Sequence, residues 1–127
     1  MKIMVVDDEP IIADTLVDIL NGEGHNALSF SQGESAIRLA EIMQPDLLVT
    51  DVVMPGMDGI ETAKAMLKVV PNCRIILFSG QAEGTDMISK ARADGHFFEV
   101  LAKPVNPDAL LAAITKTRAG KAGSVDD

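Results

Sequence analysis

Several residue types are scarce or missing in this 127-residue sequence, and each shortage excludes a class of protein. Trp and Tyr are absent and aromatic content is only 3%, all of it Phe. Stacking platforms for sugars or single-stranded nucleic acid are therefore not expected. Cys73 is the single cysteine, which excludes an internal disulfide and fits a reducing compartment. His25 and His96 have no ligand spacing with each other or with Cys73, which argues against a transition-metal site.

Long apolar runs and basic clusters are missing as well. The longest apolar run, residues 109–114, is far shorter than the roughly 18 residues of a membrane span. Lys and Arg number 11 and are scattered, against 19 Asp and Glu, for a formal charge of −8. This balance argues against nucleic acid or an anionic membrane as a direct partner. With 47% hydrophobic residues, the sequence predicts a globular protein, and we expect it to be cytoplasmic.

The sequence alternates short apolar runs with amphipathic segments. The apolar runs predict five strands: Ile3–Val6, Asn26–Phe30, Leu47–Val49, Cys73–Phe78 and Phe97–Ala102. A helix is predicted after each strand: from Pro10 to Gly22, from a Ser31–Glu34 capping box to Pro45, from Ile60 to Val70, from Glu83 to Asp94, and from Asn106–Pro107 onwards. Gly84 and Thr85 weaken the fourth helix.

Five strand–helix units in succession indicate an α/β fold. Strands that are apolar throughout are typical of a parallel sheet covered on both faces. Right-handed crossovers then give a doubly wound five-stranded sheet with five helices, for which we expect the strand order 2-1-3-4-5. We expect one domain over residues 1–118 and a short flexible tail over 119–127, which is rich in Gly and charge.

Polar side chains stand where the predicted strands end. In an open parallel sheet, ligands bind outside the carboxyl ends of the strands. Asp7 and Asp8 follow the first strand, Asp51 the third, Ser79 the fourth and Lys103 the fifth. A single Asp in such a place is more often a helix N-cap. Three carboxylates, a hydroxyl and an ammonium on one edge instead predict a functional site.

The chemistry of this group favours a divalent cation and a phosphoryl group. Clustered carboxylates repel each other unless a cation lies between them, and an all-oxygen site open to water suits Mg²⁺. An Asp beside a divalent cation and a Lys is a competent nucleophile for a phosphoryl group, because both cations neutralise the transferring oxygens.

Four motifs carry a resemblance to a known family. They are Val5–Pro10, Asp51–Gly59, Ser79–Gly80 and Lys103–Pro104, and together they extend over nearly the whole chain. The sequence resembles the receiver domain of two-component response regulators, which has a CheY-like, flavodoxin-like fold. The Asp-x-x-Met-Pro-x-Met-Asp-Gly pattern that begins at Asp51 is highly specific.

The resemblance implies a role for each residue of the site. Asp51 would accept a phosphoryl group from a histidine kinase, a histidine phosphotransfer protein or a small acyl phosphate. Asp7 and Asp8 would hold Mg²⁺ together with Asp51 and the backbone carbonyl of Val53.

The resemblance also assigns the two remaining site residues and the output. Lys103 would contact the phosphoryl oxygens, and its bond to Pro104 resembles the family's cis peptide. Ser79 would be the switch hydroxyl. The chain would be a signalling switch in a phosphorelay rather than an enzyme, assisting only its own phosphotransfer and dephosphorylation. Its output partner, or an attached output domain, is not named by the sequence, and the chain is either free-standing or the first segment of a longer regulator.

One position departs from the family pattern. The family has Tyr or Phe three residues before the Lys of strand five, and this chain has Val100. Phe98 points to the same face of the strand, since side chains alternate, and is the candidate substitute. The output face implied by the resemblance comprises the fourth helix, the fifth strand and the last helix, and includes Lys90.

Three other functions compete with the switch. A phosphatase of the haloacid-dehalogenase type would place its nucleophile at Asp7 in an Asp-x-Asp pattern, but the sequence reads Asp7-Asp8-Glu9. A docking module that is never phosphorylated would not need the set Asp8, Asp51, Ser79 and Lys103. A nucleotide-binding role is disfavoured because no glycine-rich phosphate loop follows the first strand.

Overall fold

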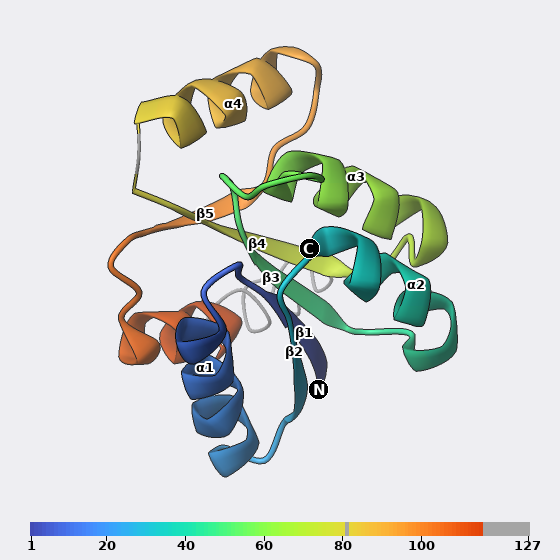
Figure 1. Cartoon of the computed structure of the whole chain (residues 1–127), viewed down its shortest axis with the longest axis vertical. Helices are drawn as coiled ribbons and strands as arrows, with labels where there is room; N and C mark the ends of the chain where they lie inside the picture. The colour runs from blue at the N-terminus through green and yellow to red at the C-terminus, as the bar shows by residue number, and fades with distance from the viewer. Residues whose placement is uncertain (81, 116–127) are drawn as a thin grey trace, which may run out of the picture.

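A five-stranded parallel sheet lies between layers of helices in the computed structural model, which describes residues 1–80 and 82–115 (Figure 1). The strands are β1 (Lys2–Val6), β2 (Asn26–Phe30), β3 (Leu47–Asp51), β4 (Arg74–Ser79) and β5 (Glu99–Ala102), in the order β2-β1-β3-β4-β5. The helices are α1 (Pro10–Gly22), α2 (Gly33–Met43), α3 (Gly59–Val69) and α4 (Ala82–Ala93), and residues 107–115 form a further helical segment. The predicted fold class and strand order are confirmed.

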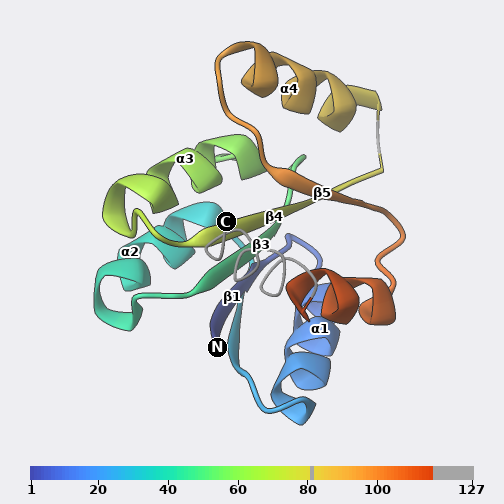
Figure 2. The ribbon, with the colours of Figure 1, turned by 180° about the vertical axis from the view of Figure 1, so that it is seen from behind.

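The sheet has a hydrophobic cluster on each face. Figure 2 shows α2 and α3 on one side of the strands, and α1 with the helical segment 107–115 on the other. Strand residues alternate between the two clusters: Met4, Val6, Leu48 and Leu77 face the first, and Ile3, Val5, Leu47, Val49, Ile76 and Phe78 face the second. Both faces are buried, which is why the strands are apolar without interruption.

Most helix starts agree with the sequence, but the capping box predicted at Ser31 and Glu34 is wrong. The helix begins at Gly33, after Gln32, whose side chain makes no capping hydrogen bond. A side chain at Gly33 would collide with that of Thr62, so close packing of α2 on α3 explains this start. The capping box belongs to α3. There the Asp58 carboxylate accepts from the backbone N–H of Glu61 at 2.8 Å, and the Glu61 carboxylate accepts from that of Asp58 at 3.0 Å.

The fifth strand is shorter than predicted. It begins at Glu99, and Phe97 is 77% exposed. Because β5 is an edge strand that pairs only with β4, Phe97 has no second neighbour to bury it. Phe98 stacks on His96 with ring centroids 6.0 Å apart and also packs against the cluster on the α2–α3 face.

The last predicted helix begins as expected. The Asn106 side chain accepts from the backbone N–H of Asp108 at 2.9 Å, and Leu110 and Ile114 are buried. The end of the predicted domain (116–118) and the predicted tail (119–127) lie outside the described residues. Within the described part of the chain, no helix combines the length and apolarity needed to cross a bilayer.

Candidate functional site at the carboxyl ends of the strands

The sheet brings the predicted site residues to one edge. Asp7 directly follows β1, Asp51 and Ser79 end β3 and β4, and Lys103 directly follows β5. Backbone hydrogen bonds continue the ladder at the rim of the site: Asp7 N–H donates to the carbonyl of Phe30, and Lys103 N–H donates to that of Ser79, both at 3.1 Å. The parallel pairing of the strands therefore fixes the backbone positions from which the side chains of the site project.

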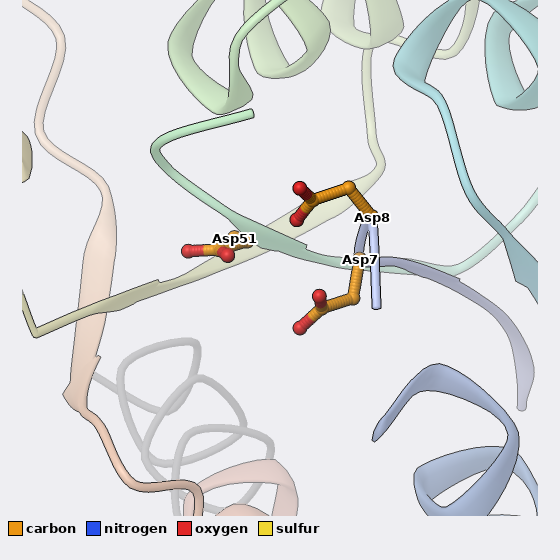
Figure 3. A group of neighbouring side chains, drawn as sticks. All are labelled: Asp7, Asp8 and Asp51. Carbon is orange, nitrogen blue, oxygen red and sulfur yellow. The ribbon is translucent and has the colours of Figure 1, made fainter. Parts of the chain in front are cut away.

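Three carboxylates meet at this edge (Figure 3). One oxygen each from Asp7, Asp8 and Asp51 lies within 4.8 Å of the others, with Asp7 and Asp51 buried and Asp8 exposed. Among the described residues, no other group of three or more His, Cys, Asp or Glu side chains is arranged to hold a metal ion. The side with the exposed Asp8 is the open side of the cluster.

The Lys103 ammonium lies against the buried part of the cluster. Its Nζ is 2.8 Å from Oδ2 of Asp51 and 3.7 Å from Oδ2 of Asp7. Partial burial alone would lower the pKa of Lys103, but the hydrogen bond and charge of Asp51, with the charge of Asp7, outweigh it and raise that pKa. Lys103 is therefore charged and neutralises one of the three carboxylates.

Asp7 carries the clearest sign that the cluster suits a cation. Its Oδ1 accepts from the backbone N–H of Glu9 at 2.9 Å, whereas its Oδ2 is buried and, among the described residues, has no hydrogen-bond partner. Burial raises the pKa of Asp7, and the nearby Asp51 and Asp8 carboxylates raise it further. Because three carboxylates face one ammonium, the local charge is about −2, which one divalent cation balances. An all-oxygen donor set with an open side fits Mg²⁺.

Ser79 lies beside the cluster, but its hydroxyl is not engaged there. The Ser79 Oγ is buried and has no hydrogen-bond partner within the described residues. It lies close to Gly84 in the first turn of α4: a Cβ built on Gly84 would stand 2.9 Å from that oxygen. The Ser79 hydroxyl therefore lies beneath the first turn of α4.

Three glycines around the site were overlooked or undervalued as site residues. A side chain at Gly59 would collide with the backbone carbonyl of Asp51, and a Cβ at Gly80 would lie 2.7 Å from Cβ of Lys103. In the sequence, Gly84 weakens the fourth helix, but nothing there indicates its contact with Ser79. Gly59 and Gly80 belong to motifs quoted above, but nothing local in the sequence shows what they contact.

Two features in and beside the fifth strand relate to the family pattern. The Lys103–Pro104 peptide is cis, as the resemblance implied. Val100 is 36% exposed and contributes to neither hydrophobic cluster, whereas Phe98 is half-buried. Phe98 precedes β5, which begins at Glu99, so it does not share a face of this strand with Val100 as the alternation predicted, and the two residues differ in surroundings.

Comparison with known proteins defines the family. The sequence model of the response regulator receiver domain matches residues 3–115, so the chain belongs to that family. Sporulation initiation phosphotransferase F of Bacillus subtilis (strain 168) is 35% identical over 118 residues, which cover 91% of each chain. The chemotaxis protein CheY of Thermotoga maritima is 29% identical over 116 residues, covering 91% of this chain and 95% of the relative.

Solved structures agree with this family. A receiver domain protein from Clostridium thermocellum superposes with a TM-score of 0.81 at 29% identity, covering 94% of this chain and 95% of the other. Chemotaxis protein CheY4 of Vibrio cholerae gives a TM-score of 0.77 at 26% identity, with 91% and 96% covered.

Other relatives are longer than this chain. The chain spans about half the length of the DNA-binding response regulator MtrA of Mycolicibacterium smegmatis (48%) and of the nitrate/nitrite response regulator protein NarL of Escherichia coli K12 (55%). This chain is therefore a receiver domain of two-component signalling, and the family occurs both as a short protein and as one part of a longer one.

Proposed function

We propose that this chain is a phosphorylation-controlled signalling switch that accepts one phosphoryl group on Asp51. The observation that carries the proposal is the 2.8 Å contact between Lys103 Nζ and the Asp51 carboxylate, beside a second and a third carboxylate. An Oδ of Asp51 attacks the phosphorus, the bond from phosphorus to the donor's imidazole nitrogen or acyl oxygen breaks, and the leaving group keeps the electron pair. Lys103 stays charged and stabilises the transferring oxygens.

Mg²⁺ would be held by Asp7, Asp8 and Asp51, with the backbone carbonyl of Val53 as a further ligand. The bound ion would neutralise charge on the phosphoryl oxygens. Asp7 supports this assignment because its buried Oδ2 has no hydrogen-bond partner in the described part of the chain. Lys103 contacts the same Asp51 carboxylate at 2.8 Å, so a phosphoryl group on Asp51 would be near both the ammonium and the ion.

The phosphodonor would be a histidine kinase or a histidine phosphotransfer protein. Support comes from a groove of about 550 Å³ next to Lys103, whose apolar lining includes Ile11, Ile12, Leu16 and Val105. Ile11 is 82% exposed although it stands in the first turn of α1. An exposed apolar surface beside a reactive group is typical of a site where a partner docks.

The output would be read on the face formed by α4, β5 and the helical segment 107–115, including Lys90 and Phe98. We propose no reaction on an external substrate: the chain would assist only its own phosphotransfer and dephosphorylation. The cytoplasm is the compartment that fits best, since Cys73 is a free buried thiol.

Phosphorylation by acetyl phosphate tests the proposal. We expect intact-mass spectrometry to show one phosphoryl group per chain, only with Mg²⁺ present, and none in Asp51→Asn. Beryllofluoride should bind under the same conditions and shift amide NMR signals in α4 and β5 as well as around Asp51.

Two outcomes would replace the proposal with a competing function. If no adduct forms with either reagent, the chain is a docking module. If Asp51→Asn still releases phosphate from an added organophosphate while Asp7→Asn does not, the chain is a phosphatase that uses Asp7. If shifts stay confined to the surroundings of Asp51, the output face is wrong.

A further inference from the structure

We propose that Gly84 is a positioning residue: it makes the room in which the Ser79 hydroxyl is held away from Asp51, and it thereby sets how readily the switch turns on. This inference rests on the proposed function. The juxtaposition that carries it is the buried Ser79 Oγ, which lies 2.9 Å from the place where a Cβ on Gly84 would stand, in the first turn of α4.

The space at Gly84 is filled by the switch residue and by the phosphorylation loop. A Cβ at this position would stand 2.9 Å from Ser79 Oγ, 3.5 Å from Cγ2 of Val53 and 3.6 Å from Cβ of Val52. The two valines are at ordinary van der Waals distance and would tolerate a methyl group. The hydroxyl is too close, so a side chain at Gly84 conflicts with one atom, Ser79 Oγ.

The present position of the Ser79 Oγ is energetically unfavourable. In its present position the Ser79 Oγ is buried and finds no hydrogen-bond partner among the described residues. A buried hydroxyl without a partner is unfavourable. A phosphoryl group on Asp51 would offer an acceptor, and another staggered χ1 rotamer of Ser79 is the way to reach it. Gly84 is what keeps the unfavourable rotamer accessible.

Movement of the hydroxyl would be felt by α4 because that helix is loosely attached. In Figure 1, α4 lies beside α3 at the β5 end of the sheet, and α3 is its principal neighbour. Only Gly84, Ile88 and Ala91 of α4 are buried. When the hydroxyl leaves, a void opens beneath Gly84, and the first turn of α4 is free to settle into it.

Residues in and beside the fifth strand are less suited than Gly84 to respond to movement of the Ser79 hydroxyl. Val100, where the family carries an aromatic ring, is 36% exposed and packs in neither cluster. Phe98 is held by its stack on His96 and by the cluster on the α2–α3 face. The Ser79–Gly84 contact is therefore the direct path from the site to α4.

Gly84→Ala tests the inference by titration with beryllofluoride and Mg²⁺, followed by amide NMR signals of α4 and of the site. The added methyl disfavours the stored rotamer, so the midpoint should fall about tenfold, at the lower end of what overpacking by one methyl group costs. In the unliganded variant, α4 signals should already lie part of the way towards the beryllofluoride-bound positions of the wild type.

Two controls separate the contact from the greater helix propensity of Ala. Gly22→Ala adds the same methyl at a position with nothing within 4 Å and should leave the midpoint unchanged. In a Ser79→Ala background the hydroxyl is gone, so adding Gly84→Ala should change the midpoint by less than twofold. A tenfold effect that persists in this background would overturn the inference.

Two further outcomes would refute either the proposed function or the role of Gly84. If wild type does not bind beryllofluoride at all, the proposed function fails. If wild type binds it and Gly84→Ala binds with the same midpoint, α4 has moved aside to accept the methyl, and Gly84 does not position Ser79.

Discussion

Replacing Asp7 by Asn should make the protein more stable and less responsive to Mg²⁺. The Asp7 side chain is 2% exposed, and its Oδ2 has no hydrogen-bond partner in the described residues; the Lys103 ammonium, 3.7 Å away, is its one ion-pair contact among those residues. Asn keeps the shape of Asp and can still accept from the backbone N–H of Glu9, which now bonds Oδ1 at 2.9 Å. The substitution therefore removes a buried charge and little else.

The size of the gain follows from what that charge costs. A buried, incompletely partnered polar group costs about 1–3 kcal/mol, and the attraction to Lys103 offsets part of this, so we expect a gain of about 1–2 kcal/mol. For a chain of this length, each kcal/mol raises the melting temperature by about 4 °C. Asp8→Asn is the matched control: Asp8 is exposed, and the change in stability should stay within about 0.5 kcal/mol.

The gain should depend on pH in a defined direction. Burial raises the pKa of Asp7 above the ordinary value for an aspartate, so ionisation destabilises the folded state. At pH values well below the ordinary aspartate pKa of about 3.9, the group is protonated in both states and the cost is absent. The cost grows as pH rises from the unfolded-state pKa to the higher folded-state pKa, and it is complete above the latter. In EDTA, the advantage of Asp7→Asn should therefore grow from pH 4 towards neutral pH.

Thermal unfolding followed by far-UV circular dichroism is the assay, because the chain has no Trp or Tyr to report by fluorescence. Mg²⁺ at ten times its dissociation constant should stabilise the wild type by about 1.4 kcal/mol. Asp7→Asn should gain much less. If the variant is no more stable than wild type in EDTA at pH 7.5, the Asp7 charge does not destabilise the fold. If Mg²⁺ stabilises the variant as much as it stabilises the wild type, Asp7 is not a ligand of the ion.

Three further substitutions or reagents probe the rest of the molecule. Arg74→Met should lower the free energy of unfolding by about 2–3 kcal/mol, because the guanidinium donates to the Glu99 carboxylate at 2.8 and 3.0 Å and to two carbonyls of the helical segment 107–115. Urea unfolding measures this loss, and Arg74→Lys should recover less than half of the lost stability. Cys73 should react with a thiol reagent at pH 8 about a thousandfold more slowly than an exposed cysteine, since burial raises its pKa to about 12; a fast reaction in native buffer would contradict this. Gly33→Ala should cost about 1–3 kcal/mol by forcing α2 away from α3, and equal stability would show that the two helices are not in tight contact.

The elements and the composition of the site follow from local sequence signals. Uninterrupted apolar runs mark strands that are buried on both faces, and the polar residue at the end of each run marks the edge at which ligands bind. Asp7, Asp51, Ser79 and Lys103 were found in this way because strand ends that are parallel must lie together.

The errors arise where a distant part of the chain decides the local structure. Ser31 has the spacing of a capping residue, but the start of α2 follows the close packing of Gly33 on α3. Phe97 reads as a strand residue, but an edge strand with one neighbour cannot bury it. Gly84 reads as a flaw in a helix when only propensity is counted, whereas in the fold it is the point of contact with the switch hydroxyl.

The site is also a test of whether the chain is folded. Its charged groups come from positions 7, 8, 51 and 103, and they meet only when β1, β3, β4 and β5 have paired in register. An unfolded or partly folded chain has an aspartate at position 51 but lacks both the lysine beside it and the second and third carboxylates. A phosphodonor that requires all of these groups therefore acts only on correctly folded molecules. Misfolded copies are not phosphorylated, so no further mechanism is needed to prevent them from signalling.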